Sequence, residues 1–358
     1  MWRGAFRIAG FSVSLRAKST NSTENRGVAR DIPLTIAVGN TDRVQAIKDG
    51  RVKVEGCDVT FIPMEPEEVF FRAFRYAEFD CCELSFSSHM RVTSQGKNDY
   101  VGIPAFVSRV FRHSAFYIRT DRGINSPADL KGKTIGVPEY QMTAPVWMKG
   151  ILEDEYGVKP TDIKWRSGGQ EEPGRDERTP WSPPPGLDLK PIGDDETLVQ
   201  LFEAGELDAL MVARAPSSYR LGKPNIDRLF PDFRSVEMEY YKKTKIFPIM
   251  HLMGVKKDLA EKHPWLPGSL LKAFIEARDL AYEELLKTAA LGITLPWVEA
   301  EMKATMDVMG SDFWRYGVKE SRHEIEALAR YSYSQGLSER LLTPEDLFAP
   351  STFEISKI

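Results

Sequence analysis

Cysteine is scarce in this sequence. Only Cys57, Cys81 and Cys82 occur among 358 residues, and the last two are adjacent in an apolar stretch. Three cysteines cannot form a disulfide framework, and no CxxC or HExxH spacing of zinc ligands occurs. We therefore interpret the cysteines as core residues of a protein from a reducing compartment, and we predict no metal site.

Long apolar runs and an excess of basic charge are also absent. No segment approaches the roughly eighteen apolar residues that cross a membrane, and the net charge of −4 gives no basic surface for nucleic acid. GxGxxG, GxxxxGK and GxSxG are missing, which argues against nucleotide chemistry and acyl hydrolysis. We expect no cofactor, no nucleic-acid partner and no membrane partner.

The first thirty residues differ in composition from the rest. They are rich in Ser and Thr, and they carry six Arg or Lys residues with Glu24 as the only acid. This composition is typical of a mitochondrial targeting segment and fits a secretory signal less well. We predict a leader over residues 1–31, with the cytoplasm as the alternative location. A disordered extension or a misassigned start codon is the competing interpretation.

From residue 32 onward, short apolar stretches alternate with segments of helical periodicity. Strands are predicted at 34–38, 59–62, 79–84, 100–103, 115–118, 134–137, 162–166, 207–212 and 247–255. Helices are predicted at 66–76, 142–156, 196–203, 268–287, 297–308 and 321–334. This alternation predicts an α/β fold with mostly parallel, doubly wound sheets. Ligands of such sheets bind outside the carboxyl ends of the strands.

Cationic and titratable side chains lie close to several of these strands. Arg109, Arg112 and His113 precede the strand 115–118, Arg214 follows 207–212, and His251 lies in 247–255. A guanidinium fork matches a carboxylate, and imidazole suits proton transfer near neutral pH. We predict that the arginines bind the ligand and that the histidines are catalytic. The alternatives are that the arginines form structural ion pairs and that the histidines are core residues.

Other polar residues follow strands as well. Asn40 follows 34–38, Ser87 and Ser88 follow 79–84, and Glu139, Tyr140 and Thr143 follow 134–137. Amide and hydroxyl groups there can bind an anion, and Glu139 becomes an acid/base candidate if it faces the arginines. Ordinary turn chemistry and a helix-dipole role are the alternatives. The polar insertion 168–191, with Glu171 and Glu172, is interpreted as a solvated loop.

Six stretches occur in one consistent order along the chain: KDGRVKVEG (48–56), SRVFRHS (108–114), GVPEYQMTA (136–144), GGQEEPGR (168–175), ARAPSS (213–218) and FPIMH (247–251). Together they make the sequence resemble the 4,5-dihydroxyphthalate decarboxylase family. The string DLKGKTIGVP (129–138) alone is less specific, because transport receptors share it.

The resemblance implies a two-lobed, type II periplasmic-binding-protein-like fold with a ligand site between the lobes. It implies that lobe one combines 32–118 with 246–340, that lobe two is 119–245, and that 341–358 forms a C-terminal tail. The chain would cross between the lobes near 118–121 and 243–247. Pattern alone also permits two sequential domains.

The resemblance further implies a cofactor-independent decarboxylase that converts 4,5-dihydroxyphthalate to 3,4-dihydroxybenzoate and CO₂. His113, His251 and Glu139 are then the acid/base candidates, and the arginines hold the carboxylates of a small anionic aromatic substrate. A non-catalytic solute-binding protein and a pyrimidine-precursor or thiamin-related protein are the alternatives. Homo-oligomer formation stays open.

Overall fold

The computed structural model describes residues 31–175, 177 and 181–354. Ile32–Ile358 form one compact unit. The predicted leader, residues 1–31, lies outside the described residues except for Asp31. Among the residues described, no helix is long and apolar enough to cross a membrane.

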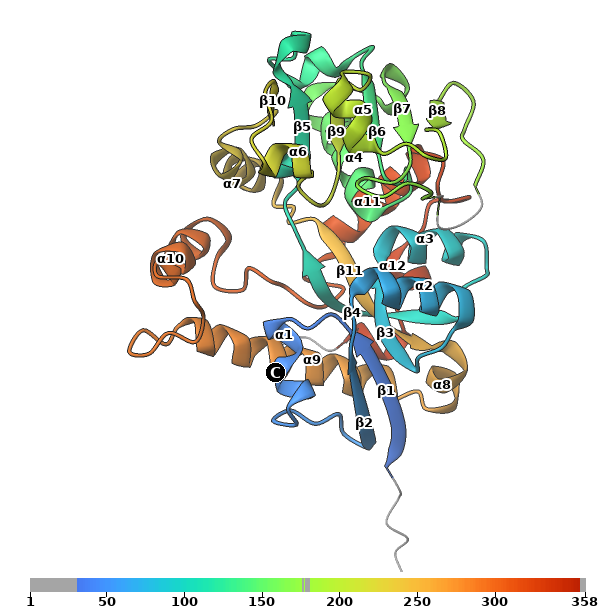
Figure 1. Ribbon diagram of the computed structural model, residues 1–358. Coiled ribbons are helices and arrows are strands. Elements are labelled where there is room, and N and C mark those ends of the chain that lie inside the picture. Colours follow the sequence, from blue (N-terminus) through green and yellow to red (C-terminus); the bar gives the residue numbers. More distant parts are fainter. Residues whose placement is uncertain (1–30, 176, 178–180, 355–358) are drawn as a thin grey trace, which may run out of the picture. The chain divides into compact units, whose positions relative to one another are not determined.

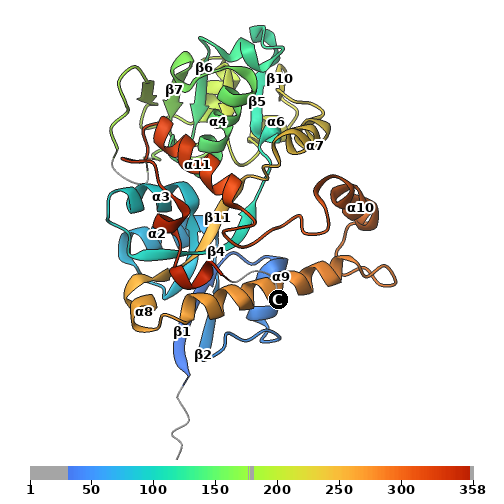
Figure 2. The ribbon, with the colours of Figure 1, turned by 180° about the vertical axis from the view of Figure 1, so that it is seen from behind.

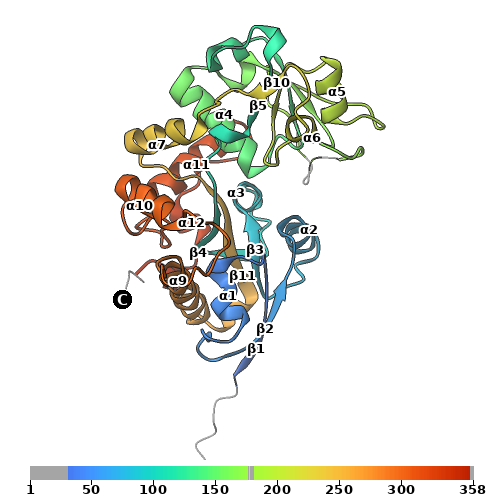
Figure 3. The same cartoon turned by 60° about the vertical axis from the view of Figure 1, so that its left-hand side comes forward.

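One sheet joins strands from two distant parts of the chain in the order β2-β1-β3-β11-β4. β1 pairs in parallel with β2 and β3, whereas β11 is antiparallel to both of its neighbours. Helices α1 and α9 lie on one face and α2 on the other (Figure 3). The bounds are β1 (Ile32–Val38), α1 (Asp42–Lys48), β2 (Cys57–Pro63), α2 (Pro66–Tyr76), β3 (Cys81–Ser85), α3 (Phe86–Ser94), β4 (Tyr100–Arg109), β11 (Ile249–Lys256), α8 (Lys257–Lys262) and α9 (Leu266–Leu285).

A second sheet has the order β10-β5-β9-β6-β7-β8 (Figure 1). β9, β6, β7 and β8 are parallel, and β5 is antiparallel to β9 and β10. The bounds are β5 (Phe116–Arg119), β6 (Thr134–Val137), α4 (Thr143–Tyr156), β7 (Lys164–Ser167), β8 (Asp188–Pro191), α5 (Leu198–Ala204), β9 (Ala209–Met211), α6 (Ser217–Arg220), β10 (Ile226–Arg228) and α7 (Phe233–Thr244).

The two sheets repeat one arrangement. In each, three parallel strands are followed by an antiparallel strand and then an edge strand, and β8 is an addition at the edge of β7. The predicted two-lobed, type II periplasmic-binding-protein-like α/β fold is therefore confirmed. The sheets are mixed, because β11 and β5, which begin just after the chain passes between the sheets, run against their neighbours.

The chain passes between the sheets at 110–115 and again at 245–248. The first passage comes earlier than the predicted 118–121, because β5 already pairs within the second sheet from Phe116. The predicted lobe boundaries themselves stay a prediction.

The six predicted helices correspond to α2, α4, α5, α9, α10 (Val298–Met309) and α11 (Arg322–Ser334), and their ends agree to within two residues; the described chain has twelve α-helices. α2 matches its prediction, and a short 3-10 helix, Pro127–Leu130, begins after Ser126. α3 was missed, because seven of its nine residues are buried and its serines suggested a turn. α7 was missed because its largely polar sequence has only Tyr240 and Tyr241 buried.

The C-terminal elements α10 (Val298–Met309), α11 (Arg322–Ser334) and α12 (Pro344–Leu347) complete the unit. Figure 2 shows α11 beside α4, and the Tyr331 ring meets that of Trp147 at 5.6 Å. The predicted C-terminal tail, where described, packs on the first sheet: Phe348 is buried against Phe86 and Phe106. The last helices thus contact elements of both sheets.

Candidate functional site

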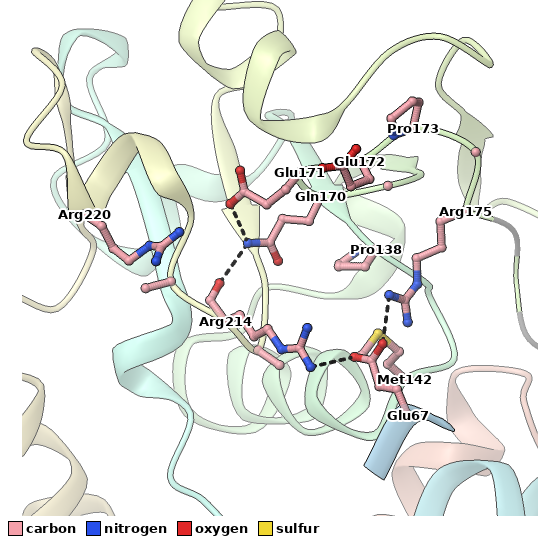
Figure 4. Close-up of a pocket in the computed structure, with 14 residues that line it drawn as sticks. Glu67, Pro138, Met142, Gln170, Glu171, Glu172, Pro173, Arg175, Arg214 and Arg220 are labelled. Carbon is pink, nitrogen blue, oxygen red and sulfur yellow. Dashed lines mark hydrogen bonds and ion pairs between the residues drawn. The ribbon is translucent and has the colours of Figure 1, made fainter. Parts of the chain in front are cut away.

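A pocket of about 710 Å³ opens among segments that follow the carboxyl ends of strands in both sheets (Figure 4). Glu67 on α2 contributes from the side of the first sheet, and all other lining residues come from segments after β6, β7 and β9. Its volume suits a small organic ligand. The lining residues are Glu67, Pro138, Met142, 169–175, Ala213, Arg214, Ala215 and Arg220.

Two glycines let the loop after β7 curve around the pocket. A Cβ at Gly169 would lie 1.6 Å from the carbonyl oxygen of Glu172, and one at Gly168 would overlap Ile192. Glu171 then accepts hydrogen bonds from the amide and hydroxyl of Ser217, at 2.8 and 2.6 Å. This contact anchors the loop to the segment that carries Arg214, so both segments are held against each other.

Arg175 is the best-anchored cation of the pocket. Its Nε and Nη2 donate to Oε1 of Glu139, at 2.9 and 2.6 Å, and Glu139 is only 3% exposed. Its Nη1 lies 3.3 Å from Oε2 of Glu67. Arg214 points at the other oxygen of Glu67, at 3.6 Å, and its side chain is 70% exposed. Glu139 thus forms an ion pair with Arg175, and its acid/base role stays a prediction.

A carboxylate–histidine pair joins the neighbouring strands β3 and β11. Oε1 of Glu83 is 2.6 Å from Nδ1 of His251, and its Oε2 accepts the amide of Gly39 at 2.8 Å. An ionised Glu83 requires the proton on Nδ1, which leaves Nε2 available as a proton acceptor. Among the described residues, Nε2 has no hydrogen-bond partner, and the His251 side chain is 22% exposed.

One face of α2 connects this pair to the pocket. The Phe70 ring meets the His251 ring edge-on, with centroids 4.7 Å apart. Glu67 lies three residues before Phe70, and side chains at that spacing share a helix face. The imidazole therefore contacts the same helix that contributes Glu67 to the pocket.

Hydroxyl groups connect the first sheet to the start of α4. Ser85, the last residue of β3, pairs with His251 of β11, and its Oγ is 3.1 Å from Oγ1 of Thr143. Ser87 donates to the carbonyl of Gln141 at 2.7 Å, and Ser88 donates to Ser85 at 3.2 Å. The predicted binding residues Ser87, Ser88 and Thr143 thus come together, and their hydrogen bonds go to one another, to Ser85 and to the backbone.

The remaining predicted residues do not line the pocket. Asn40 accepts from Lys48 at 2.8 Å, and Tyr140 is buried in a stack with Trp181. Arg109 is buried, donating to the carbonyls of Phe247 and Arg315 and lying 3.4 Å from Glu324. Arg214 lines the pocket and the buried Arg109 does not, so the two arginines do not meet at one site as expected.

Arg112 and His113 lie where the chain first passes between the sheets. Burial lowers the pKa of Arg112 to about 10, and its Nε is 3.2 Å from the sulfur of Met250. The His113 ring is buried between Phe230 and Tyr240, and neither ring nitrogen has a hydrogen-bond partner among the described residues. Nearby, burial raises the pKa of Glu237 to about 7.

His113 makes stability depend on pH. Burial lowers its pKa to about 4 from 6.5, so between these values the unfolded chain binds a proton that the folded protein excludes. The free energy of unfolding therefore decreases as pH falls from 6.5 towards 4, and the contribution is complete above 6.5. We expect His113→Leu to reduce this loss by up to about 3 kcal/mol. Urea unfolding at pH 7 and pH 4.5 measures it, and an unchanged pH dependence would contradict it.

Sequence reasoning missed Glu67, Glu83, Arg175 and Arg220. Arg175 was quoted within GGQEEPGR but not selected, because a loop of twenty-odd polar residues gives no sign of which side chain turns inward. Glu83 could have been found, since a carboxylate inside a buried strand needs a partner. Glu67 and Arg220 carry no comparable signal.

The fold and pocket define a two-lobed α/β protein of the periplasmic-binding-protein-like class with an arginine-lined pocket. This chain belongs to the 4,5-dihydroxyphthalate decarboxylase family. It is 47% identical over 327 residues to the 4,5-dihydroxyphthalate decarboxylase of Comamonas testosteroni, covering 91% of this chain and 99% of that protein. It is 45% identical over 215 residues to the 4,5-dihydroxyphthalate decarboxylase of Pseudomonas putida, and the match covers 60% of this chain and 83% of that protein.

Two further comparisons concern parts of the chain or its fold. Residues 101–172 match the family described as NMT1/THI5 like. Among solved structures, the periplasmic aliphatic sulphonate binding protein SsuA from Escherichia coli has a TM-score of 0.48 and 12% identity, covering 90% of this chain and 98% of that one. Neither comparison bears on the substrate of this chain.

Proposed function

We propose that this protein is a cofactor-independent carboxy-lyase that converts 4,5-dihydroxyphthalate to 3,4-dihydroxybenzoate and CO₂. Membership of the 4,5-dihydroxyphthalate decarboxylase family carries this proposal. The arginine-lined pocket supports it, because the substrate presents two adjacent carboxylates on a small ring. Apolar lining from Pro138, Met142 and Ala213 suits the ring.

The substrate supplies most of the electronic driving force. Each of its carboxylates is para to a hydroxyl, so a phenolate pushes electron density onto the carbon that bears the carboxylate. A proton donor at that carbon then allows CO₂ to leave, and the electrons of the broken C–C bond restore the aromatic ring. The net change consumes one proton and one carboxylate and yields the arene and CO₂.

We assign the proton transfer to Nε2 of His251. Protonated, it donates to the ring carbon, and solvent returns the proton after CO₂ has left. Glu83 stabilises the imidazolium and fixes the ring through Nδ1. Neither His113 nor His251 is among the residues that line the pocket. The proposal does not use His113, because its ring is enclosed by Phe230 and Tyr240 and burial keeps it neutral, whereas the His251 side chain is partly exposed.

The activity itself is tested with purified protein and a panel of substrates. We expect CO₂ release from 4,5-dihydroxyphthalate and none from phthalate, which lacks the activating hydroxyls. A parallel assay with EDTA tests whether a divalent ion assists. Equal turnover of both acids, or binding of 4,5-dihydroxyphthalate without CO₂ release, would contradict the proposed reaction.

For the N-terminal segment we propose mitochondrial targeting, which composition alone supports. A fluorescent protein fused behind residues 1–31 should reach mitochondria. A fusion with Arg3, Arg7 and Arg16 changed to Glu should stay in the cytosol, and equal distribution of both would contradict the proposal.

A further inference from the structure

A carboxylate of the protein itself lies between the two arginines that face each other across the pocket. Glu67 places Oε2 3.3 Å from Nη1 of Arg175 and Oε1 3.6 Å from Nη2 of Arg214 (Figure 4). The arginines come from segments after β7 and β9, whereas Glu67 belongs to α2 beside the first sheet. One carboxylate thus links elements of both sheets.

The contacts of Glu67 are looser than those that anchor Arg175. Glu139 holds Arg175 through hydrogen bonds of 2.6 and 2.9 Å, whereas the contact between Arg214 and Glu67 exceeds hydrogen-bond distance. The Glu67 side chain is also 38% exposed. Partly exposed ion pairs of this kind contribute little to the free energy of folding. Water can solvate the Glu67 carboxylate when the side chain turns away from the two arginines.

Charge matching indicates what can replace Glu67. Arg175 and Arg214 each direct a guanidinium edge at one oxygen of the Glu67 carboxylate. A carboxylate of a ligand has the same charge and the same pair of acceptor oxygens, so it can take this position when Glu67 leaves it.

We propose that Arg175 and Arg214 form the subsite for one carboxylate of an aromatic dicarboxylate ligand, and that Glu67 fills this subsite until the ligand displaces it. The inference rests on the proposed function for the class of ligand. It makes Glu67 a competitor for the arginines, so removal of its charge strengthens ligand binding.

The test is isothermal titration of the full chain with phthalate, a dicarboxylate that lacks the hydroxyls for reaction. We expect Glu67→Gln to bind phthalate about fivefold more tightly than the original protein. Glu172 is the matched control, because it lines the same pocket and, in the described part of the chain, forms no ion pair with either arginine. Glu172→Gln should change affinity by less than about twofold.

Catechol, which has no carboxylate, should bind both variants and the original protein equally. Unchanged or weaker binding of phthalate by Glu67→Gln, or equal tightening by Glu172→Gln, would overturn the proposal. Absence of phthalate binding in every variant would overturn it as well. CO₂ release by the original protein is measured separately, so a failed subsite and a failed enzymatic function give different results.

Discussion

Replacement of His251 by Gln is expected to lower kcat for 4,5-dihydroxyphthalate by about 10²- to 10⁴-fold, the usual range for loss of a general acid or base. Gln can still donate a hydrogen bond to Glu83, so the local packing around Phe70 should persist. KM should change little, because the arginines hold the carboxylates. Steady-state kinetics of CO₂ release measures both constants.

His323→Gln is the matched control, since that exposed imidazole on α11 contacts the carbonyl of Thr244 and does not line the pocket. Its kcat should stay within about twofold of the original value. Glu83→Gln should lower kcat by about 10- to 100-fold through loss of orientation and change the pH profile of kcat, which a purely structural role would leave alone. A His251→Gln protein that keeps most of its activity would refute the assignment.

Arg175→Lys is expected to raise KM by about 10- to 100-fold, with a smaller effect on kcat. Lysine keeps the charge beside the buried Glu139, which protects the fold, but it has no planar fork to hold Glu139 and a ligand carboxylate together. Loss of one hydrogen bond to a charged group weakens the interaction by about 1.5–3 kcal/mol. KM from CO₂ release and thermal unfolding of the same sample separate binding from stability.

Arg220→Lys provides the comparison for Arg175. Arg220 lines the same pocket from α6 but does not contact Glu67 or Glu139 in the described structure. We expect its KM to change by less than about threefold. An effect as large as that of Arg175→Lys would mean that total positive charge, and not the paired geometry, governs binding.

Local pattern determined the type of most of the longer elements; α3 and α7 are exceptions, because one is buried on nearly every side and the other is largely polar. The apolar stretches gave the strands, the proline at the start of α2 gave its beginning, and glycine at 157 ended α4 in the left-handed conformation. The repeated alternation gave the α/β class. The resemblance to a known family was needed for the two-lobed arrangement, since pattern alone permits sequential domains.

Tertiary structure decided which side chains meet. Arg109 and Arg214 look alike in sequence, yet one is buried against Glu324 and the other faces the pocket, since the direction of a side chain depends on which sheet its strand joins. Glu83 and His251 are 168 residues apart and form a pair only because β11 returns to lie against β3. Local pattern cannot encode such a contact, because it arises from strand pairing between distant segments.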